Sequence, residues 1–227
     1  LRKLFEYYKG NEKLKGFLFF SSSEIYGDPQ PQNIPTNENY RGNVSSVGPR
    51  SCYDESKRMG ETLCYIFAKE YSLPISIVRP FNNYGPGLRI GDKRLPADFA
   101  WQVVNKKDMI IYSDGKPTRT FCYISDAIIG YLKALHFKDF DYFNIGIDNP
   151  ELSVTQYAEL FAHNAKLLFN YSPDIIFHNN SDKEYLKDNP NRRCPDISKA
   201  RRILEFNPLI KPSEGIRRYL TFLKETL

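Results

Sequence analysis

Short apolar runs alternate along the chain with longer segments in which apolar residues recur every three or four positions. Runs of the first kind are typical of buried strands, and the second spacing is typical of amphipathic helices. Because the two patterns alternate, we expect an α/β fold built on an open, doubly wound parallel sheet. The expected strands cover residues 16–21, 75–78, 109–112, 141–145 and 174–178, and the expected helices cover 1–8, 54–71, 95–104, 125–135, 153–169, 197–204 and 213–227.

The segments between these elements are polar. Residues 28–50 are rich in proline and too irregular for a helix or strand, so we expect a loop that covers a site. Ser153 stands at the start of an expected helix, where its hydroxyl can cap the first turn.

The composition is that of a folded globular protein. Of 227 residues, 41% are hydrophobic and 15% aromatic, which argues against a disordered chain. No apolar run approaches the roughly 18 residues that span a bilayer, so we expect no membrane association. The cysteines have no Cys-x-x-Cys spacing and the histidines are scattered, which predicts reduced thiols, a cytoplasmic location and no metal site. These residues are Cys52, Cys64, Cys122, Cys194, His136, His163 and His178.

The net charge of +5 does not predict a nucleic-acid surface, because the basic residues form pairs rather than a tract. The pairs at 201–202 and 217–218 have acidic neighbours in helical patterns and are expected on solvated helix faces. Arg192 and Arg193 differ, since they follow the loop-forming residues 188–191. An arginine held on a loop suits bidentate contact with a diphosphate.

Tyr53 stands four residues before Lys57, so the two side chains share one face of a helix. An ammonium beside a phenol favours the phenolate, and a hydroxyl from Ser22 at the end of the first strand could position a substrate alcohol. Together these groups could remove a proton from that alcohol. A Tyr-x-x-x-Lys spacing is weak evidence alone, and serines often simply terminate strands.

Two further motifs accompany this spacing: Ser21-Ser-Ser-Glu-Ile-Tyr-Gly27 before it, and Arg79-Pro-Phe-Asn-Asn-Tyr-Gly-Pro86 after it. The ordered set resembles the extended short-chain dehydrogenase/reductase family, the nicotinamide-dependent enzymes that act on nucleotide sugars. Gly48-Pro-Arg50 and Arg193-Cys-Pro-Asp196 look most like the UDP-glucuronate decarboxylases within that family. Pro80, Asn83 and Cys194 depart from the decarboxylase pattern.

The resemblance implies a Rossmann-like fold, NAD as cofactor and a role for each motif residue. Tyr53 would be the general base and Lys57 would contact the nicotinamide ribose. The diphosphate of the nucleotide sugar would be bound by Asn82, Arg119 and Arg193. A turn remains the alternative for Asn82, and ordinary surface positions remain the alternative for the two arginines.

Ser23 and Glu24 discriminate between reactions. Related 4,6-dehydratases carry Asp-Glu here, whereas Ser23 is a poor acid and is expected only to bind substrate. Glu24 could orient the sugar ring or a water for protonation, and its alternative is a cap on local backbone. Arg50 could pair with a sugar carboxylate.

Enzymes of this kind begin with a glycine-rich turn that binds the NAD pyrophosphate, and the printed sequence has no Gly-x-x-Gly-x-x-Gly. We therefore expect residues 1–85 to be the remainder of a truncated NAD-binding domain, which alone binds NAD poorly. Residues 86–227 would mainly form a smaller α/β region that binds the nucleotide sugar, with some segments returning to the first sheet. We also expect a homodimer through the helix at 53–71, with Cys64, Ile66 and Phe67 on its exposed surface.

Other functions remain open. The nearest alternatives are a nucleotide-sugar 4-epimerase and a 4,6-dehydratase. An alternative of another class is an inactive protein that binds nucleotide sugars or serves in an assembly, which the missing glycine-rich turn favours and the intact Tyr53 and Lys57 oppose.

Overall fold

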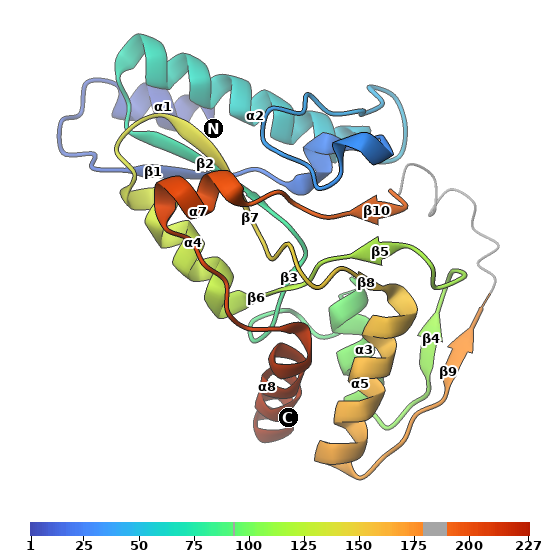
Figure 1. The fold of residues 1–227 in the computed structure, drawn as a ribbon. Coiled ribbons are helices and arrows are strands. Elements are labelled where there is room, and N and C mark those ends of the chain that lie inside the picture. The colour runs from blue at the N-terminus through green and yellow to red at the C-terminus, as the bar shows by residue number, and fades with distance from the viewer. Residues whose placement is uncertain (93, 179–189) are drawn as a thin grey trace.

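A three-stranded parallel sheet forms one half of the computed structural model, which describes residues 1–92, 94–178 and 190–227 (Figure 1). Its strands are β1 (Phe17–Phe20), β2 (Ile75–Pro80) and β7 (Asp141–Ile145), in the order β1-β2-β7. All pairs are parallel, with Phe19 opposite Ile77 and Val78 opposite Phe143. These are the strands expected from the apolar runs.

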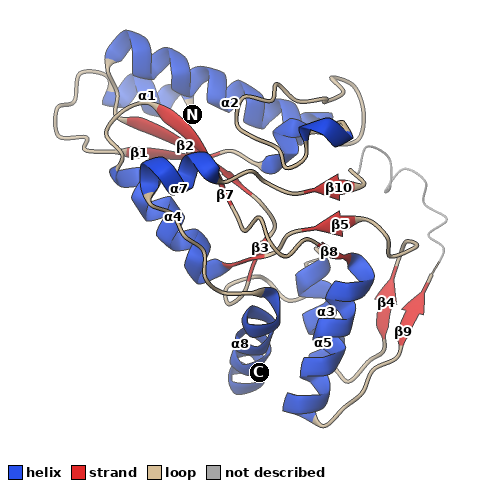
Figure 2. Ribbon diagram, in the orientation of Figure 1, coloured by secondary structure: helices blue, strands red, loops and turns tan. Residues whose placement is uncertain are grey.

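Helices cover both faces of this sheet. Ile77 packs with residues of α1 (Arg2–Tyr8) and α2 (Ser51–Tyr71), whereas its neighbour Val78 packs with residues of α4 (Ile124–His136) and α7 (Ser198–Leu204). Because successive strand residues point to opposite faces, α1 and α2 lie on one face and α4 and α7 on the other (Figure 2). The expected doubly wound α/β arrangement is confirmed.

The core-facing side of α2 corrects one expectation. Cys64 is fully buried and Phe67 is 7% exposed, because α1 covers them and Phe5 packs 5.2 Å from the Phe67 ring. Neither can contribute to an exposed helix surface. Ile66 is exposed as expected, and the other large apolar residues exposed on this helix are Tyr53, Met59 and Tyr65.

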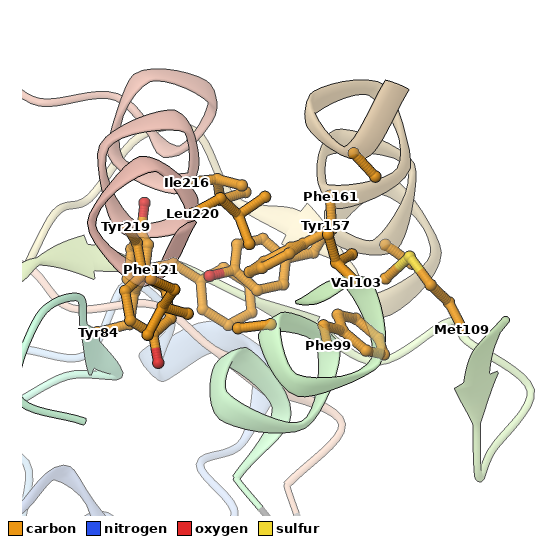
Figure 3. Close-up of a cluster of buried hydrophobic side chains, with 14 of the residues drawn as sticks. Tyr84, Phe99, Val103, Met109, Phe121, Tyr157, Phe161, Ile216, Tyr219 and Leu220 are labelled. Atoms are coloured by element: carbon orange, nitrogen blue, oxygen red, sulfur yellow. The ribbon is translucent and has the colours of Figure 1, made fainter. Parts of the chain in front are cut away.

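A second core fills the other half of the molecule. Helices α3 (Leu95–Val104), α5 (Val154–Phe169) and α8 (Pro212–Thr226) enclose an aromatic cluster in which Phe121 stacks on Tyr157 at 3.6 Å (Figure 3). Ser153 caps α5 as expected, since its Oγ accepts from Gln156 N while the Gln156 side chain accepts from Ser153 N.

Among the described residues, short strands form three further small sheets. The described pairs are β3 (Asn83–Tyr84) with β6 (Cys122–Tyr123), and β4 (Met109–Ile111) with β9 (Ile175–Phe177). A third small sheet has the order β10-β5-β8, made of β10 (Arg192–Arg193), β5 (Thr118–Arg119) and β8 (Leu152–Ser153). The strand expected at 174–178 was wrongly taken as the last, because β10 follows it. Asp188 and Asn189, expected in the preceding loop, lie outside the described residues.

Residues 28–50 form the expected irregular segment. It follows the short 3-10 helix η1 (Ser23–Tyr26) and contains a second, η2 (Pro31–Asn33). Isolated bridges join Gly27 to Asn43 and Thr36 to Pro195, so the segment touches the C-terminal part of the chain. The division at residue 85 remains a prediction.

Two further findings concern the cysteines and the search for a membrane-spanning helix. All four cysteines are free thiols, and only Cys52 is exposed. In the described ranges, no helix combines the length and apolar character needed to cross a membrane.

Candidate active site

A cavity of about 780 Å³ lies where the two halves meet, at the carboxyl ends of β1 and β2. Ligands of open α/β sheets bind at this edge. Eight of the nine residues predicted for the site line it, from segments far apart in the sequence: Ser22, Ser23, Glu24, Arg50, Tyr53, Asn82, Arg119 and Arg193. Lys57 does not line it.

Tyr53 and Lys57 lie one turn apart at the start of α2. The Lys57 Nζ is 5.6 Å from the centre of the Tyr53 ring and donates a 2.9 Å hydrogen bond to the Phe20 carbonyl at the end of β1. The helix can come this close because Gly60 lies against the Phe19 ring, where an added Cβ would meet Phe19 Cζ at 2.2 Å. The Tyr53 side chain is 46% exposed and so can reach a ligand in the cavity.

Ser22 ends the strand and begins η1. Its Oγ accepts a 3.2 Å hydrogen bond from Glu24 N, and its side chain is nearly buried. This N-cap leaves the hydroxyl proton available to a ligand, because accepting the cap bond uses only a lone pair.

Glu24 forms ion pairs with Arg193 and Arg50. Arg193 donates through both terminal nitrogens, with Nη2 at 3.0 Å from Glu24 Oε2, and Arg50 Nη2 contacts the same oxygen. Burial opposes ionisation of Glu24, but the charges and hydrogen bonds of the arginines outweigh it and lower its pKa. The Glu24 carboxylate therefore holds arginines rather than capping local backbone.

Arg119 lies beside Arg193 because β5 and β10 pair in parallel, with these two residues in register. Its guanidinium donates to the Pro190 carbonyl at 2.5 Å and to the Asn191 carbonyl at 3.3 Å. Burial, together with the charge of Arg193, lowers the pKa of Arg119 to about 10. The cavity wall therefore gathers Arg50, Arg119 and Arg193 beside Glu24. Since Arg94 and Asp98 also line the cavity, its four arginines outnumber its two carboxylates and leave it positively charged.

Asn82 forms the turn that was the alternative to a binding role, and it also lines the cavity. Its φ of +42° is a left-handed conformation that asparagine tolerates, so it does form a turn after β2. Its Nδ2 donates to the Thr120 carbonyl at 2.9 Å, and the residue lines the cavity near Arg119.

The sequence analysis did not assign several residues that line the cavity. Two of them are Asn83 and Tyr131, and Asn83 Nδ2 donates a hydrogen bond to the Tyr131 hydroxyl. Burial raises the pKa of the Tyr131 hydroxyl, so it stays neutral. Asn83 stood in a quoted motif and could have been found there. Tyr131 could not, because it belongs to an amphipathic helix whose pattern marks only the core side. The others include Arg94, Asp98 and Tyr112.

Among the residues that the structure describes, no cluster of three or more His, Cys, Asp or Glu side chains could hold a metal ion. The polar side chains that line the cavity include hydroxyls, arginines and the carboxylates of Glu24 and Asp98.

Curated proteins with similar sequences are UDP-glucuronic acid decarboxylases. The chain is 34% identical over 211 residues to UDP-glucuronic acid decarboxylase 1 of Xenopus tropicalis, covering 92% of this chain and 47% of that protein. It is 38% identical over 200 residues to UDP-glucuronic acid decarboxylase 3 of Arabidopsis thaliana, covering 88% and 55%. The chain thus spans about half the length of the curated relatives it matches.

Solved structures with a similar fold include two sugar-nucleotide epimerases and a dTDP-glucose 4,6-dehydratase. UDP-glucuronic acid 4-epimerase of Bacillus cereus, in complex with UDP-glucuronic acid and NAD, has a TM-score of 0.75 and 27% identity, covering 100% of this chain and 66% of that chain. UDP-glucose 4-epimerase of Thermotoga maritima, with a TM-score of 0.81, 22% identity and coverage of 98% and 67%, shares the fold.

One family model matches residues 2–146, the part that contains the sheet, α2 and most of the cavity wall; its description is "NAD dependent epimerase/dehydratase family". Together with the sequence identities, this match shows that the chain belongs to the NAD dependent epimerase/dehydratase family.

Proposed function

We propose that this chain carries the proton-transfer and nucleotide-sugar-binding residues of an NAD-dependent UDP-glucuronate decarboxylase. The observation that carries the proposal is the single cavity in which Tyr53 and Ser22 face the arginines of β5 and β10. The curated relatives with this name support the choice of reaction.

The residues present fit the nicotinamide end of NAD. Lys57 is fixed at the carboxyl end of β1 and Tyr53 lies one turn before it, so both would meet a nicotinamide ribose at this sheet edge. When bound there, NAD would supply the hydride chemistry at carbon 4 of the sugar. Contacts with the phosphates of NAD are not assigned to residues of this chain.

The proton chemistry follows from the side chains. Ser22 donates to the oxygen on carbon 4, and Tyr53 takes the proton of that hydroxyl as general base. Oxidation at carbon 4 makes the carboxylate on carbon 5 part of a β-keto acid, which loses carbon dioxide to give an enolate. Carbon 5 then takes a proton from a water molecule and the ketone is reduced, with Tyr53 returning its proton to the oxygen.

Glu24 is not the acid in this scheme. Its lowered pKa and its ion pairs keep it a carboxylate, so it orients Arg193 and Arg50 or a water molecule. Ser23 stands where a dehydratase would need a proton donor, which favours loss of carbon dioxide over loss of water.

The positive cavity suits the substrate. UDP-glucuronate carries a diphosphate and a carboxylate, and the four arginines that line the cavity outnumber its two carboxylates, Glu24 and Asp98. We assign Asn82, Arg119 and Arg193 to the diphosphate. The guanidinium of Arg193 would then donate hydrogen bonds both to Glu24 and to the ligand. Arg50 is assigned to the sugar carboxylate.

A 4-epimerase is the second candidate, because the similar Bacillus cereus structure is a UDP-glucuronic acid 4-epimerase. The test is a product assay by mass, with UDP-glucuronate and NAD added to the complete gene product that contains this chain. The proposal expects loss of carbon dioxide. An unchanged mass with inverted carbon 4 would make it an epimerase, and loss of water from a neutral nucleotide hexose would make it a dehydratase. Binding without any product would indicate an inactive sugar-nucleotide-binding protein.

We further propose a homodimer that pairs α2 of two subunits. Met59, Tyr65 and Ile66 supply apolar surface on that helix. Sedimentation at high concentration tests this, and a monomer at every concentration would contradict it. A cytoplasmic location remains our proposal, and cell fractionation tests it.

A further inference from the structure

Asn144 lies near the carboxyl end of β7 and is completely buried. Its side-chain oxygen, its side-chain nitrogen and its backbone N–H all form hydrogen bonds. Its Nδ2 donates to the Thr36 carbonyl at 2.9 Å and to the Asp196 carbonyl at 3.1 Å. Its Oδ1 accepts from the Tyr26 hydroxyl at 2.8 Å, and its backbone N–H donates to Glu38 Oε1 at 2.9 Å. One side chain thus ties three separate segments to the central sheet.

Each of these segments carries a charged residue of the cavity. Tyr26 belongs to η1, which also holds Glu24, and Asp196 stands three residues after Arg193. Thr36 belongs to the segment that ends at Arg50. Thr36 and the C-terminal segment are also joined directly, because Thr36 N donates to the Cys194 carbonyl and Asp196 N donates to the Thr36 carbonyl, both at 2.9 Å.

We propose that Asn144 is a positioning residue: by holding Thr36 and Asp196 to the sheet, it sets where Arg193 meets Glu24 and so the affinity for an anionic nucleotide sugar. The inference rests on the proposed function for its substrate. An amide is required, because the side chain must donate twice to carbonyls and accept once from a phenol. Tyr53 and Lys57 do not depend on Asn144, since α2 is anchored on β1.

The test is Asn144→Asp in the complete gene product. A carboxylate keeps the acceptor for Tyr26 but cannot donate to Thr36 or Asp196. Asn164→Asp is the matched control, because Asn164 is also buried, at 2% exposed, and donates only to the Leu160 carbonyl within α5. We expect Asn144→Asp to raise KM for UDP-glucuronate about tenfold, while kcat stays within about threefold of the wild-type value. A displaced Arg193 charge weakens binding by this order.

Asn164→Asp should lose about as much thermal stability as Asn144→Asp but should leave KM unchanged. Equal KM values in the two variants, or a fall in kcat alone, would overturn the proposal, since a merely structural asparagine behaves in that way.

A second measurement compares the same two variants without turnover. If Asn144 holds these segments to the sheet, Asn144→Asp should lower the hydrogen-exchange protection of the Thr36 and Asp196 backbone amides by about tenfold relative to the wild type, and Asn164→Asp should not. Unchanged protection in Asn144→Asp would overturn the proposal. Absence of product from UDP-glucuronate would remove the proposed function but would leave this exchange result standing.

Discussion

The sheet β1-β2-β7 and the sheet β10-β5-β8 meet at one cavity but are built differently. The first has strands of four to six residues whose side chains form cores on both faces. The second has strands of two residues that carry Arg119 and Arg193. From this difference we propose that the first sheet provides stability and the proton-transfer residues at its edge, whereas the second provides charge for the substrate.

The largest expected effect is on the proton-transfer side. Tyr53→Phe should lower kcat by about 10²–10⁴-fold while leaving KM for UDP-glucuronate nearly unchanged, because only general-base catalysis is lost. Steady-state kinetics measure this. Tyr65→Phe on the same helix is the control, since Tyr65 is exposed and packs on Phe140 outside the cavity. Normal turnover by Tyr53→Phe would remove Tyr53 from the mechanism.

The next effect separates the two kinds of sheet by stability. Ile77→Ala in β2 should cost about 2–5 kcal/mol of unfolding free energy, because Ile77 is 1% exposed and packs under α2. Ile176→Ala in the two-stranded sheet β4-β9 should cost less than about 1 kcal/mol, because Ile176 is 39% exposed. Urea denaturation measures both. Equal costs would show that the short strands stabilise the fold as much as the long sheet does.

The smallest effect concerns the charge contact between the regions. The arginines hold the pKa of Glu24 below its ordinary value although burial opposes this, so the pair stabilises the fold above the unfolded pKa of about 4.3. That contribution is lost as the pH falls through the lowered folded pKa. The stability advantage of the wild type over Glu24→Gln should therefore shrink as the pH falls below about 4.3.

Glu38→Gln is the control of opposite sign. Burial raises the pKa of Glu38, so the folded state takes up its proton more readily and the wild type gains on this variant as the pH falls. Denaturant titrations across the pH range compare the two variants. If the stability difference from the wild type changed in the same direction with pH for both variants, the ion pairs of Glu24 would not lower its pKa as described.

The long sheet could be predicted from the sequence and the short one could not. Strand 141–145 and helix 95–104 were placed to the residue, because their apolar positions have a clear period. Two-residue strands have no period, and β5 is formed only by pairing with residues 152–153 and 192–193.

The site shows the same limit. The motif residues were found one by one, but the ion pair between Glu24 and Arg193 joins residues 169 positions apart, which no local pattern encodes. Cys64 and Phe67 were expected on the surface of α2 because the cover provided by α1 is also a tertiary contact.

The central claim is that the cavity between the two regions binds the nucleotide sugar. Calorimetric titration of UDP-glucuronate into the Tyr53→Phe protein with NAD present tests it directly, because the ligand is not consumed. Adding Arg193→Gln should weaken binding about 10–100-fold, the order expected for lost charge-assisted hydrogen bonds. Adding Arg192→Gln should change it by less than about threefold, because Arg192 is paired with Glu151 and does not line the cavity. Equal affinity of the Arg193→Gln and Arg192→Gln proteins, both folded by thermal melt, would contradict the claim.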